Sequence, residues 1–308
     1  MPKEVYTLAD LRNWREATAD ATPPLRLAVF GDPVAHSKSP AMHNAALAAL
    51  GIDARYTRLH IHPDELAEAV RLLPGTGFIG ANFTIPHKFA ALDLMDEVDE
   101  RARKTASMNT VLVDNGKLRG FSTDGPGLVR AVRAEFGVDL RDLRVMLLGA
   151  GGGAGRAIAV QCGLENCERL VLVNRTFEKA QALAVELVPF FQAAKFTGPV
   201  ARLEAVPWDE TQLAFQLRHT DLVINATSMG MQFSDPSPLP ESILLPHLMI
   251  YDTIYTAART SLLRAADLAG ARGTNGLSML LHQGALSFEI WFNREAPVDV
   301  MRKALQAA

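Results

Sequence analysis

Short hydrophobic runs alternate with amphipathic stretches along the first part of the chain. The runs have the length of strands, and the stretches between them carry apolar residues at helical spacing. The pattern predicts strands at Leu27 to Phe30, Ala54 to Leu59 and Phe78 to Thr84, and helices at Ala41 to Leu50 and Pro63 to Leu73. Ser39 and Pro40 precede the first helix, as a capping hydroxyl and a proline of the first turn. Strands that alternate with helices are typical of a mostly parallel α/β sheet.

The alternation starts again after Pro126, and Arg144 to Gly149 is the strongest strand signal in the chain. Helices are predicted over 127–135 and 177–187, and further strands over 170–174 and 222–225. We therefore predict an α/β protein of two domains. Residues 1–124 with the returning helices of 277–308 form the first domain, and residues 125–276 form the second. An amphipathic stretch from Leu8 to Thr18 makes residues 1–24 an N-terminal helical appendage.

Composition excludes several classes of protein. The 308 residues are 48% hydrophobic, enough for a substantial core, and a formal net charge of -3 gives no reason to expect nucleic acid or anionic membrane as a partner. The two cysteines, Cys162 and Cys167, lack the spacing of a metal site or a disulfide framework, which favours the reducing cytoplasm. The first residues lack the apolar stretch of a signal peptide, and no apolar run approaches the roughly 20 residues that span a bilayer, so we expect neither feature. We expect a cytoplasmic protein that acts on a small molecule, as a monomer or a homodimer.

A glycine-rich segment, Gly149 to Gly155, follows the strongest strand and opens a helix. This is the context that a dinucleotide-binding fingerprint requires, and Gly149, Gly151 and Ala154 satisfy G-x-G-x-x-A. Glycine allows the backbone to approach a pyrophosphate, while the first N–H groups of the helix face its charge. The second domain is therefore predicted to be a Rossmann-type dinucleotide-binding domain.

The end of the next strand indicates which nicotinamide nucleotide binds. NAD-binding domains usually carry Asp or Glu there to hold the ribose 2′-hydroxyl. This chain has Asn174, Arg175 and Thr176 instead, with Lys179 one helical turn beyond Arg175. A guanidinium attracts a 2′-phosphate that a carboxylate would repel, so NADP is the predicted cofactor.

Polar residues gather where the strands of the first domain end. Ser37 and Ser39 lie on the loop after the first strand, Thr84 and Lys88 follow a later strand, and Asn109 and Asp124 lie further along the chain. Small ligands bind at the carboxyl ends of strands in open α/β sheets, so these groups are candidates to hold one hydroxylated molecule. Taken singly, each has a plain structural interpretation as a helix cap or a surface residue.

The sequence resembles the shikimate dehydrogenase (shikimate/quinate dehydrogenase) family from Leu25 to about Trp291. The motifs that carry the resemblance are Ala28 to Pro40, Gly80 to Lys88, Asn109-Thr110, Ser122 to Gly127, the glycine-rich segment, Asn174 to Thr176, Asn225 to Gly230, Tyr251-Asp252 with Tyr255, and Gly276 to Gln283. Several positions depart from the family pattern: Ser122 stands where Asn is common, Thr256-Ala257 where Asn-Pro is frequent, and Ser278 where Gly is common, and the glycine-rich segment is one residue longer.

The resemblance implies an NADP-dependent enzyme that reversibly reduces 3-dehydroshikimate to shikimate, in aromatic amino acid and chorismate biosynthesis, within a cleft between two domains. Lys88 and Asp124 would assist hydride transfer as the catalytic pair, and the sequence leaves open which of them moves the proton. The substrate would be bound by Ser37, Ser39, Thr84, Asn109, Tyr255 and Gln283. The cofactor would be bound by Gly149, Ala150, Gly151, Gly152, Gly153, Ala154, Asn174, Arg175, Thr176, Lys179, Thr227, Ser228, Met229 and Gly276.

Three alternatives stay open at this point. The nearest is a sibling enzyme acting on quinate or aminoshikimate with NAD or NADP, although Ser37 and Ser39 favour shikimate, because relatives that accept quinate often carry a bulkier second hydroxyl residue. A non-catalytic regulatory relative is disfavoured because Lys88 and Asp124 are both kept. An unrelated dehydrogenase would lack the motifs around Ser37 and Thr84. His36 and His87 lack the spacing of metal ligands, so no metal is expected.

Overall fold

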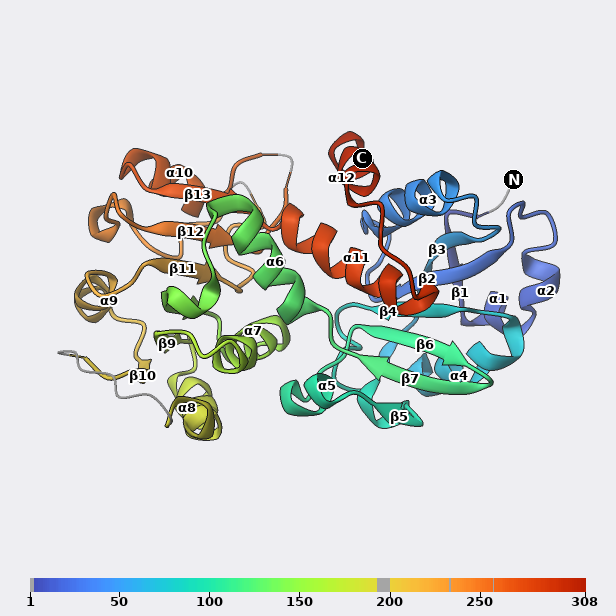
Figure 1. Ribbon diagram of the computed structural model, residues 1–308, viewed down its shortest axis with the longest axis horizontal. Helices are drawn as coiled ribbons and strands as arrows, with labels where there is room; N and C mark the ends of the chain where they lie inside the picture. The colour runs from blue at the N-terminus through green and yellow to red at the C-terminus, as the bar shows by residue number, and fades with distance from the viewer. Residues whose placement is uncertain (1–2, 193–199, 233, 257) are drawn as a thin grey trace. The chain divides into compact units, whose positions relative to one another are not determined.

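The computed structural model describes residues 3–192, 200–232, 234–256 and 258–308, which form two compact units (Figure 1). Unit 1 comprises the chain up to Gly127 together with Leu280–Ala308, and unit 2 comprises Leu128–Met279. The boundaries fall inside two helices, α6 (Asp124–Phe136) and α11 (Leu277–Phe292). Each unit contains one β-sheet covered by helices, in agreement with the predicted α/β class. None of the helices in the described ranges is long and apolar enough to cross a membrane.

The sheet of unit 1 has the strand order β1-β3-β2-β4-β6-β7-β5. Its strands are β1 (Val5–Thr7), β2 (Leu25–Gly31), β3 (Arg55–His60), β4 (Gly80–Phe83), β5 (Glu97–Val98), β6 (Thr110–Asp114) and β7 (Lys117–Phe121). Strands β1, β3, β2 and β4 pair with one another in parallel, as predicted, and β5 pairs in parallel with β7. β6 is antiparallel to both β4 and β7. The sheet is therefore mixed.

The antiparallel hairpin of β6 and β7 was not predicted, although its turn has a clear sequence signal. Asp114 pairs with Lys117, so the loop contains only Asn115 and Gly116. Both loop residues have positive φ, +50° and +80°, the combination of a type I′ turn, whose twist matches that of the flanking strands. Asn-Gly is the preferred dipeptide for this turn, and it places Asn109 and the residues after β7 side by side.

The N-terminal residues extend the sheet of unit 1 instead of forming a separate helical appendage. β1 pairs in parallel with β3, and the amphipathic stretch forms two short helices, α1 (Leu8–Arg12) and α2 (Trp14–Ala17). Trp14 is 5% exposed, and its ring lies 5.2 Å from that of Tyr6 and 5.1 Å from that of Phe78. Its indole N–H donates to the Leu25 carbonyl at 3.3 Å. This segment is thus part of the hydrophobic core.

The remaining helices of unit 1 are α3 (Ser39–Ala49), α4 (Leu66–Leu72), α5 (Glu100–Thr105), α11 from Leu280 onward and α12 (Val298–Ala307), with short 3-10 turns at Pro63–Glu65, Leu73–Thr76 and Leu92–Leu94. Ser39 is already the first helical residue of α3, so the expectation that its hydroxyl caps the helix is wrong. Lys38 occupies the cap position, and the Ser37 hydroxyl accepts the Ser39 N–H at 3.3 Å.

Helices α3 and α11 bury an aromatic cluster against the sheet. Trp291 of α11 donates its indole N–H to the Val111 carbonyl at 2.9 Å, and a Cβ on Gly80 would lie 2.3 Å from that nitrogen. The His43 ring of α3 stacks on Tyr56 at 4.5 Å and lies 5.2 Å from Trp291. Burial lowers the pKa of His43 to about 3, so the imidazole is neutral in the folded protein.

Unit 2 is built on a parallel six-stranded sheet with the order β10-β9-β8-β11-β12-β13. Its strands are β8 (Arg144–Leu148), β9 (Arg169–Val173), β10 (Leu203–Val206), β11 (Leu222–Asn225), β12 (Met249–Asp252) and β13 (Arg272–Asn275). The helices are α6 from Leu128 onward, α7 (Gly153–Leu164), α8 (Phe177–Phe191), α9 (Glu210–Leu217) and α10 (Ser261–Leu268), with 3-10 turns at Leu140–Asp142 and Glu241–Ile243. Counted from β8, this is the strand order 3-2-1-4-5-6 of a Rossmann-type domain.

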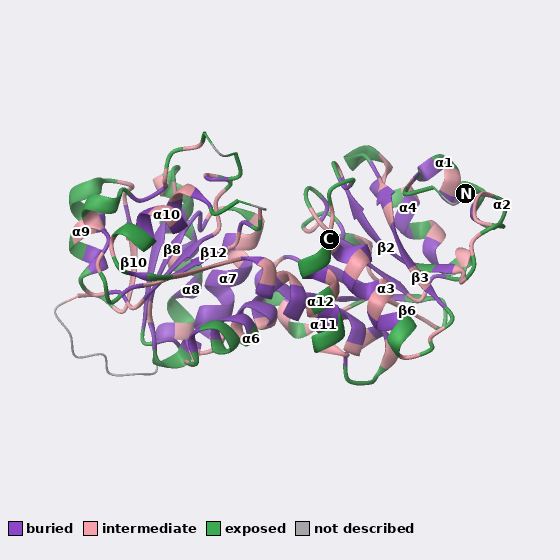
Figure 2. Ribbon diagram, turned by 90° about the horizontal axis from the view of Figure 1, so that it is seen from above, coloured by how far each residue is buried: buried purple, intermediate pink, exposed green. Residues whose placement is uncertain are grey.

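The central strands β8, β9 and β11 of unit 2 are hydrophobic on both faces because helices cover both sides of the sheet (Figure 2). In β8, Val145 and Leu147 belong to the hydrophobic cluster on one face, and Met146 and Leu148 to the cluster on the other. This explains why Arg144 to Gly149 gave the strongest strand signal of the sequence.

Candidate active site

Lys88 and Asp124 form an ion pair at the carboxyl ends of the unit 1 strands. Lys88 lies on the segment after β4, and Asp124 is the first residue of α6, three residues beyond β7. The Lys88 ammonium is 2.6 Å from Asp124 Oδ2, and the side chains are only 19% and 8% exposed. Little water surrounds the pair, so its charges act on a bound molecule with weak screening.

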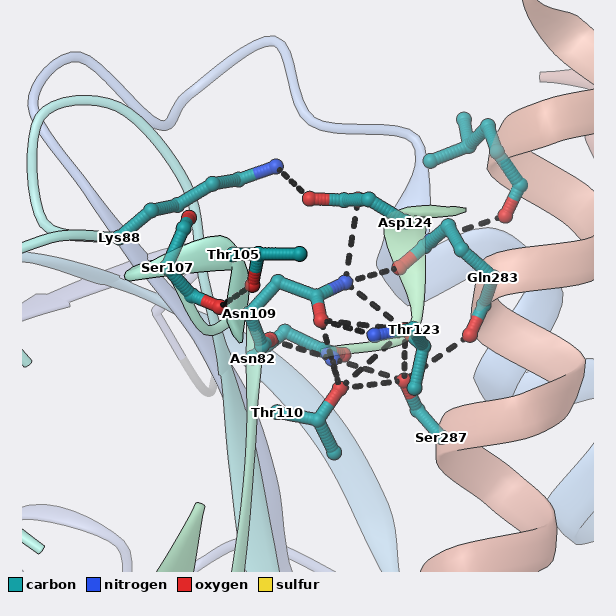
Figure 3. A network of polar contacts seen from close by, with 11 residues as sticks. Asn82, Lys88, Thr105, Ser107, Asn109, Thr110, Thr123, Asp124, Gln283 and Ser287 are labelled. Atoms are coloured by element: carbon teal, nitrogen blue, oxygen red, sulfur yellow. Dashed lines mark hydrogen bonds and ion pairs between the residues drawn. The ribbon is translucent and has the colours of Figure 1, made fainter. Parts of the chain in front are cut away.

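Asn109 holds the other oxygen of Asp124. Its amide nitrogen lies within hydrogen-bond distance of three acceptors: Asp124 Oδ1 at 3.2 Å, Thr123 Oγ1 at 2.8 Å and Gln283 Oε1 at 3.0 Å (Figure 3). Its amide oxygen accepts the backbone N–H of Thr123 at 2.7 Å. Gln283, from α11, donates its own amide to the Leu280 carbonyl at 2.9 Å. The carboxylate of Asp124 is therefore fixed by a buried amide as well as by Lys88.

Asn82 of β4 supports the position of Asn109, and sequence reasoning did not single it out. Its amide nitrogen lies 3.0 Å from the Asn109 carbonyl, 3.1 Å from Thr110 Oγ1 and 3.0 Å from Ser287 Oγ. Its amide oxygen accepts the hydroxyl of Tyr56 at 2.8 Å. The available signal was a polar residue inside an otherwise hydrophobic strand, which a core tolerates only where its hydrogen bonds are satisfied.

The predicted substrate residues Ser37, Ser39 and Thr84 also belong to unit 1. Ser39 is 6% exposed. Burial raises the pKa of the nearby Tyr56 hydroxyl well above 10, an effect that Ser39 opposes. Gly31 makes room for Thr84, since a Cβ on Gly31 would lie 2.4 Å from the Thr84 methyl group. Tyr255 lies in unit 2 after β12 and is 37% exposed.

The glycine-rich segment of unit 2 turns sharply between β8 and α7. Gly149 has a φ of +85°, which disfavours any residue with a side chain, and its N–H donates to the Val173 carbonyl at 2.8 Å. A Cβ on Gly155 would lie 2.1 Å from the Gly149 carbonyl oxygen. Helix α7 begins at Gly153, so its first N–H groups face the turn, the geometry that binds phosphate.

The residues after β9 contact the turn of the glycine-rich segment. Asn174 accepts the Gly151 N–H at 3.1 Å and donates to the Thr176 carbonyl at 2.9 Å. A Cβ on Gly151 would lie 2.9 Å from Cβ of Lys179, so the absence of a side chain lets the segments approach. Arg175, Thr176 and Lys179 are exposed. A turn of backbone N–H groups beside exposed cations has the chemistry of a phosphate-binding site.

The segment after β11 contains Thr227, Ser228 and Met229, and two buried polar residues shape it. Asn225 Oδ1 accepts both the Thr227 N–H, at 3.1 Å, and its hydroxyl, at 2.7 Å. The Asn225 amide donates to Asp252 Oδ1 at 2.9 Å. Burial raises the pKa of Asp252, while hydrogen bonds from Thr260, Ile254 and Asn225 oppose that rise.

Gly276 follows β13, where a Cβ would lie 2.0 Å from the Thr253 carbonyl oxygen. The residue therefore permits a close approach of two backbone segments.

The two histidines that lie beside Ser37 and Lys88 in the sequence differ in burial. His36 is exposed, whereas His87 is buried and its Nε2 donates to the Ile61 carbonyl at 2.8 Å. Burial lowers the pKa of His87.

Comparison with known proteins identifies the family. Residues 29–111 match the model of the shikimate dehydrogenase substrate binding domain, and residues 276–306 match that of the shikimate 5'-dehydrogenase C-terminal domain. The chain is 40% identical over 279 residues to the shikimate dehydrogenase (NADP(+)) of Methanopyrus kandleri, an alignment that covers 90% of this chain and 93% of the relative.

Solved structures agree with the sequence relatives. The shikimate 5-dehydrogenase of Thermus thermophilus, in complex with NADP(H) and shikimate, matches with a TM-score of 0.79 and 36% identity, covering 92% of this chain and 99% of that chain. Quinate dehydrogenase from Corynebacterium glutamicum in complex with NAD matches with a TM-score of 0.79 and 29% identity, covering 92% and 99%. The predicted resemblance is confirmed: the chain belongs to the shikimate dehydrogenase family.

Proposed function

We propose that this protein is an NADP-dependent shikimate dehydrogenase, which reversibly reduces 3-dehydroshikimate to shikimate in aromatic amino acid and chorismate biosynthesis. The observation that carries the proposal is the sheltered pair of Lys88 and Asp124, held by Asn109 and Gln283 in a chain that belongs to this family. Unit 1 is then the substrate-binding and catalytic domain, and unit 2 the NADP-binding domain.

Lys88 and Asp124 carry the proton chemistry in this proposal. When bound, NADP accepts a hydride from the alcohol carbon, or NADPH returns it to the ketone. The hydroxyl oxygen must lose a proton in one direction and gain it in the other. The ammonium of Lys88 stabilises negative charge on that oxygen, and Asp124, restrained by Asn109, orients the ammonium. We treat the two residues as one proton-carrying unit.

The remaining polar residues would bind the substrate's carboxylate and hydroxyl groups. They are Ser37, Ser39, Thr84, Asn109, Tyr255 and Gln283. Short hydroxyl and amide side chains match such groups one hydrogen bond at a time, and a substrate that lacks a partner leaves a buried polar atom unsatisfied. Substrate choice within the family therefore depends on a few contacts.

NADP is favoured over NAD by the residues around the glycine-rich segment. The pyrophosphate would lie against Gly149 to Ala154, at the start of α7. Arg175, Thr176 and Lys179 would hold the 2′-phosphate, and Thr227 to Met229 with Gly276 would line the pocket. No carboxylate stands at the end of β9, where it would repel that phosphate. Two buried free cysteines and a biosynthetic role support a cytoplasmic location.

The second candidate is a quinate dehydrogenase, which the similarity to the Corynebacterium glutamicum enzyme supports. Purified protein should be offered shikimate or quinate with NADP or NAD, in all four pairings, while nicotinamide absorbance is followed. Rapid reduction with shikimate and NADP alone is the expected result. Comparable rates with quinate or NAD would favour the sibling enzyme. If folded protein bound NADP but reduced it in no pairing, the proposed activity would be wrong.

A further inference from the structure

Three metal-ligating side chains converge where β2 and β3 end in unit 1. Asp32 directly follows β2, His60 is the last residue of β3, and His62 lies two residues further on. The strands are parallel neighbours in which Gly31 pairs with His60, so their ends lie side by side. His60 and His62 share one side of the extended chain because residues two apart face the same way.

The ligand atoms are close enough to share one ion. His60 Nε2 lies 2.8 Å from Asp32 Oδ1, and His62 Nδ1 lies 3.1 Å from Asp32 Oδ2. One ligand atom from each residue lies within 4.8 Å of the others. Zinc bonds to N and O of about 2.0–2.2 Å in a tetrahedron separate the ligand atoms by roughly 3.3 Å. Shifts of up to about 1.5 Å would therefore bring the ligand atoms to these separations.

We propose that Asp32, His60 and His62 form a binding site for one divalent transition-metal ion of the zinc class. Two imidazoles and one carboxylate are a donor set that Zn²⁺ accepts, and three protein ligands leave a fourth position for water. The side chains of Asp32, His60 and His62 are 28%, 37% and 57% exposed, so an ion can reach them from solvent. The sequence predicted no metal, so the proposal departs from that expectation.

The site adjoins the segment that carries Lys88. The Asp32 N–H donates to the Ile85 carbonyl at 3.1 Å, and the carbonyl of Ile61, between the two histidines, accepts the His87 ring N–H at 2.8 Å. An ion that joins the ends of β2 and β3 would therefore fix two of the backbone points to which this segment is attached. The inference concerns metal binding and stability, and it holds whether or not the proposed enzymatic function is correct.

The competing interpretation is a histidine–aspartate cluster held only by its own hydrogen bonds. Metal-free, tag-free full-length protein should be titrated with Zn²⁺ by calorimetry and with Co²⁺ by visible absorbance. We expect one saturable Zn²⁺ per chain, a tetrahedral Co²⁺ spectrum, and a melting temperature that rises with Zn²⁺. His60→Gln and His62→Gln should each weaken binding by about tenfold or more, and the double variant should abolish it.

His219→Gln is the matched control, because His219 is a partly exposed histidine of unit 2 remote in sequence from the cluster, and its binding curve should equal that of the unaltered protein. Melting curves recorded without metal establish that the variants are folded. No saturable binding by the unaltered protein, or unchanged binding by the folded double variant, would overturn the proposal.

Discussion

Replacing Lys88 by methionine tests the proposed chemistry most directly, because methionine keeps an unbranched apolar stem but removes the ammonium. The charge that is lost lies 2.6 Å from Asp124 Oδ2 in a pair that is largely shielded from water. A positioned proton-transfer group contributes about 10²- to 10⁴-fold to turnover, equivalent to about 3–5 kcal/mol of the activation barrier. We therefore expect kcat of Lys88→Met to fall by that factor.

Binding of the cofactor should be spared, because the residues proposed to hold NADP belong to unit 2. The hydrogen bond from Asn109 to Asp124 at 3.2 Å remains, so the site keeps its shape. The unpaired carboxylate lowers the free energy of unfolding by about 1–3 kcal/mol. The assay follows nicotinamide absorbance with shikimate and NADP, and the affinity for NADPH is measured separately by fluorescence.

Lys104→Met is the control, since Lys104 pairs with Glu100 at 2.7 Å on an exposed helix surface and its loss should leave kcat unchanged. If Lys88→Met retained turnover within a factor of about three of the unaltered protein, the catalytic role given to Lys88 would be refuted. A fall in turnover together with loss of NADPH binding would also count against it, because it would show a general defect.

Three further predictions follow from single contacts. Gly155→Ala should weaken NADP binding by about tenfold or more, because the new Cβ would lie 2.1 Å from a backbone oxygen of the glycine-rich segment. Gly75→Ala is the control, because its Cβ meets nothing within 4 Å and NADP affinity should not change. Equal NADP affinities of the two variants in a fluorescence titration would contradict this prediction. Arg175→Ser should raise KM for NADP by about 10- to 100-fold and change KM for NAD little. Equal increases in KM for NADP and for NAD in steady-state kinetics would disprove the role of Arg175. Burial lowers the pKa of His43 to about 3 from 6.5. The neutral imidazole therefore contributes to the free energy of unfolding in full above pH 6.5, and this contribution, on the order of 5 kcal/mol, is lost as the pH falls toward 3. His43→Phe should therefore flatten the decline of unfolding free energy in acid, as denaturant titrations at several pH values would show, and an unchanged slope would reject the assignment.

The parallel parts of the fold were predictable because they depend on local pattern. β11 begins and ends where predicted, and β8 ends one residue earlier than expected, since strands buried on both faces need an uninterrupted hydrophobic run. The hairpin of β6 and β7 was missed because its strands are partly polar, although Asn115-Gly116 marked the turn. β1 was missed because three residues carry too short a pattern, and only tertiary pairing with β3 makes them a strand.

Some residues of the candidate site could be predicted from local sequence motifs, and others could not. Lys88, Asp124 and Asn109 lie in recognisable motifs, and the structure joins them. Asn82 and Ser287 support the site through contacts between β4 and α11, residues 205 apart in sequence, which no local pattern encodes. The Asp32, His60 and His62 cluster had a partial signal, the His-x-His spacing at a strand end, but its third member comes from another strand.

The discontinuity of unit 1 has a consequence for how the protein is made. Asn109 finds its partner Gln283 only 174 residues later, and at about 5–20 residues per second a ribosome needs on the order of ten to thirty seconds to supply it. All of unit 2 leaves the ribosome before Leu280–Ala308, the last part of unit 1, so unit 2 is the first unit whose sequence is complete. A nascent chain therefore contains the whole of unit 2 before the hydrogen bond between Asn109 and Gln283 can form. A chain cut short just after Met279 would contain all of unit 2 but lack Gln283, so the hydrogen bonds around Asn109 would be incomplete.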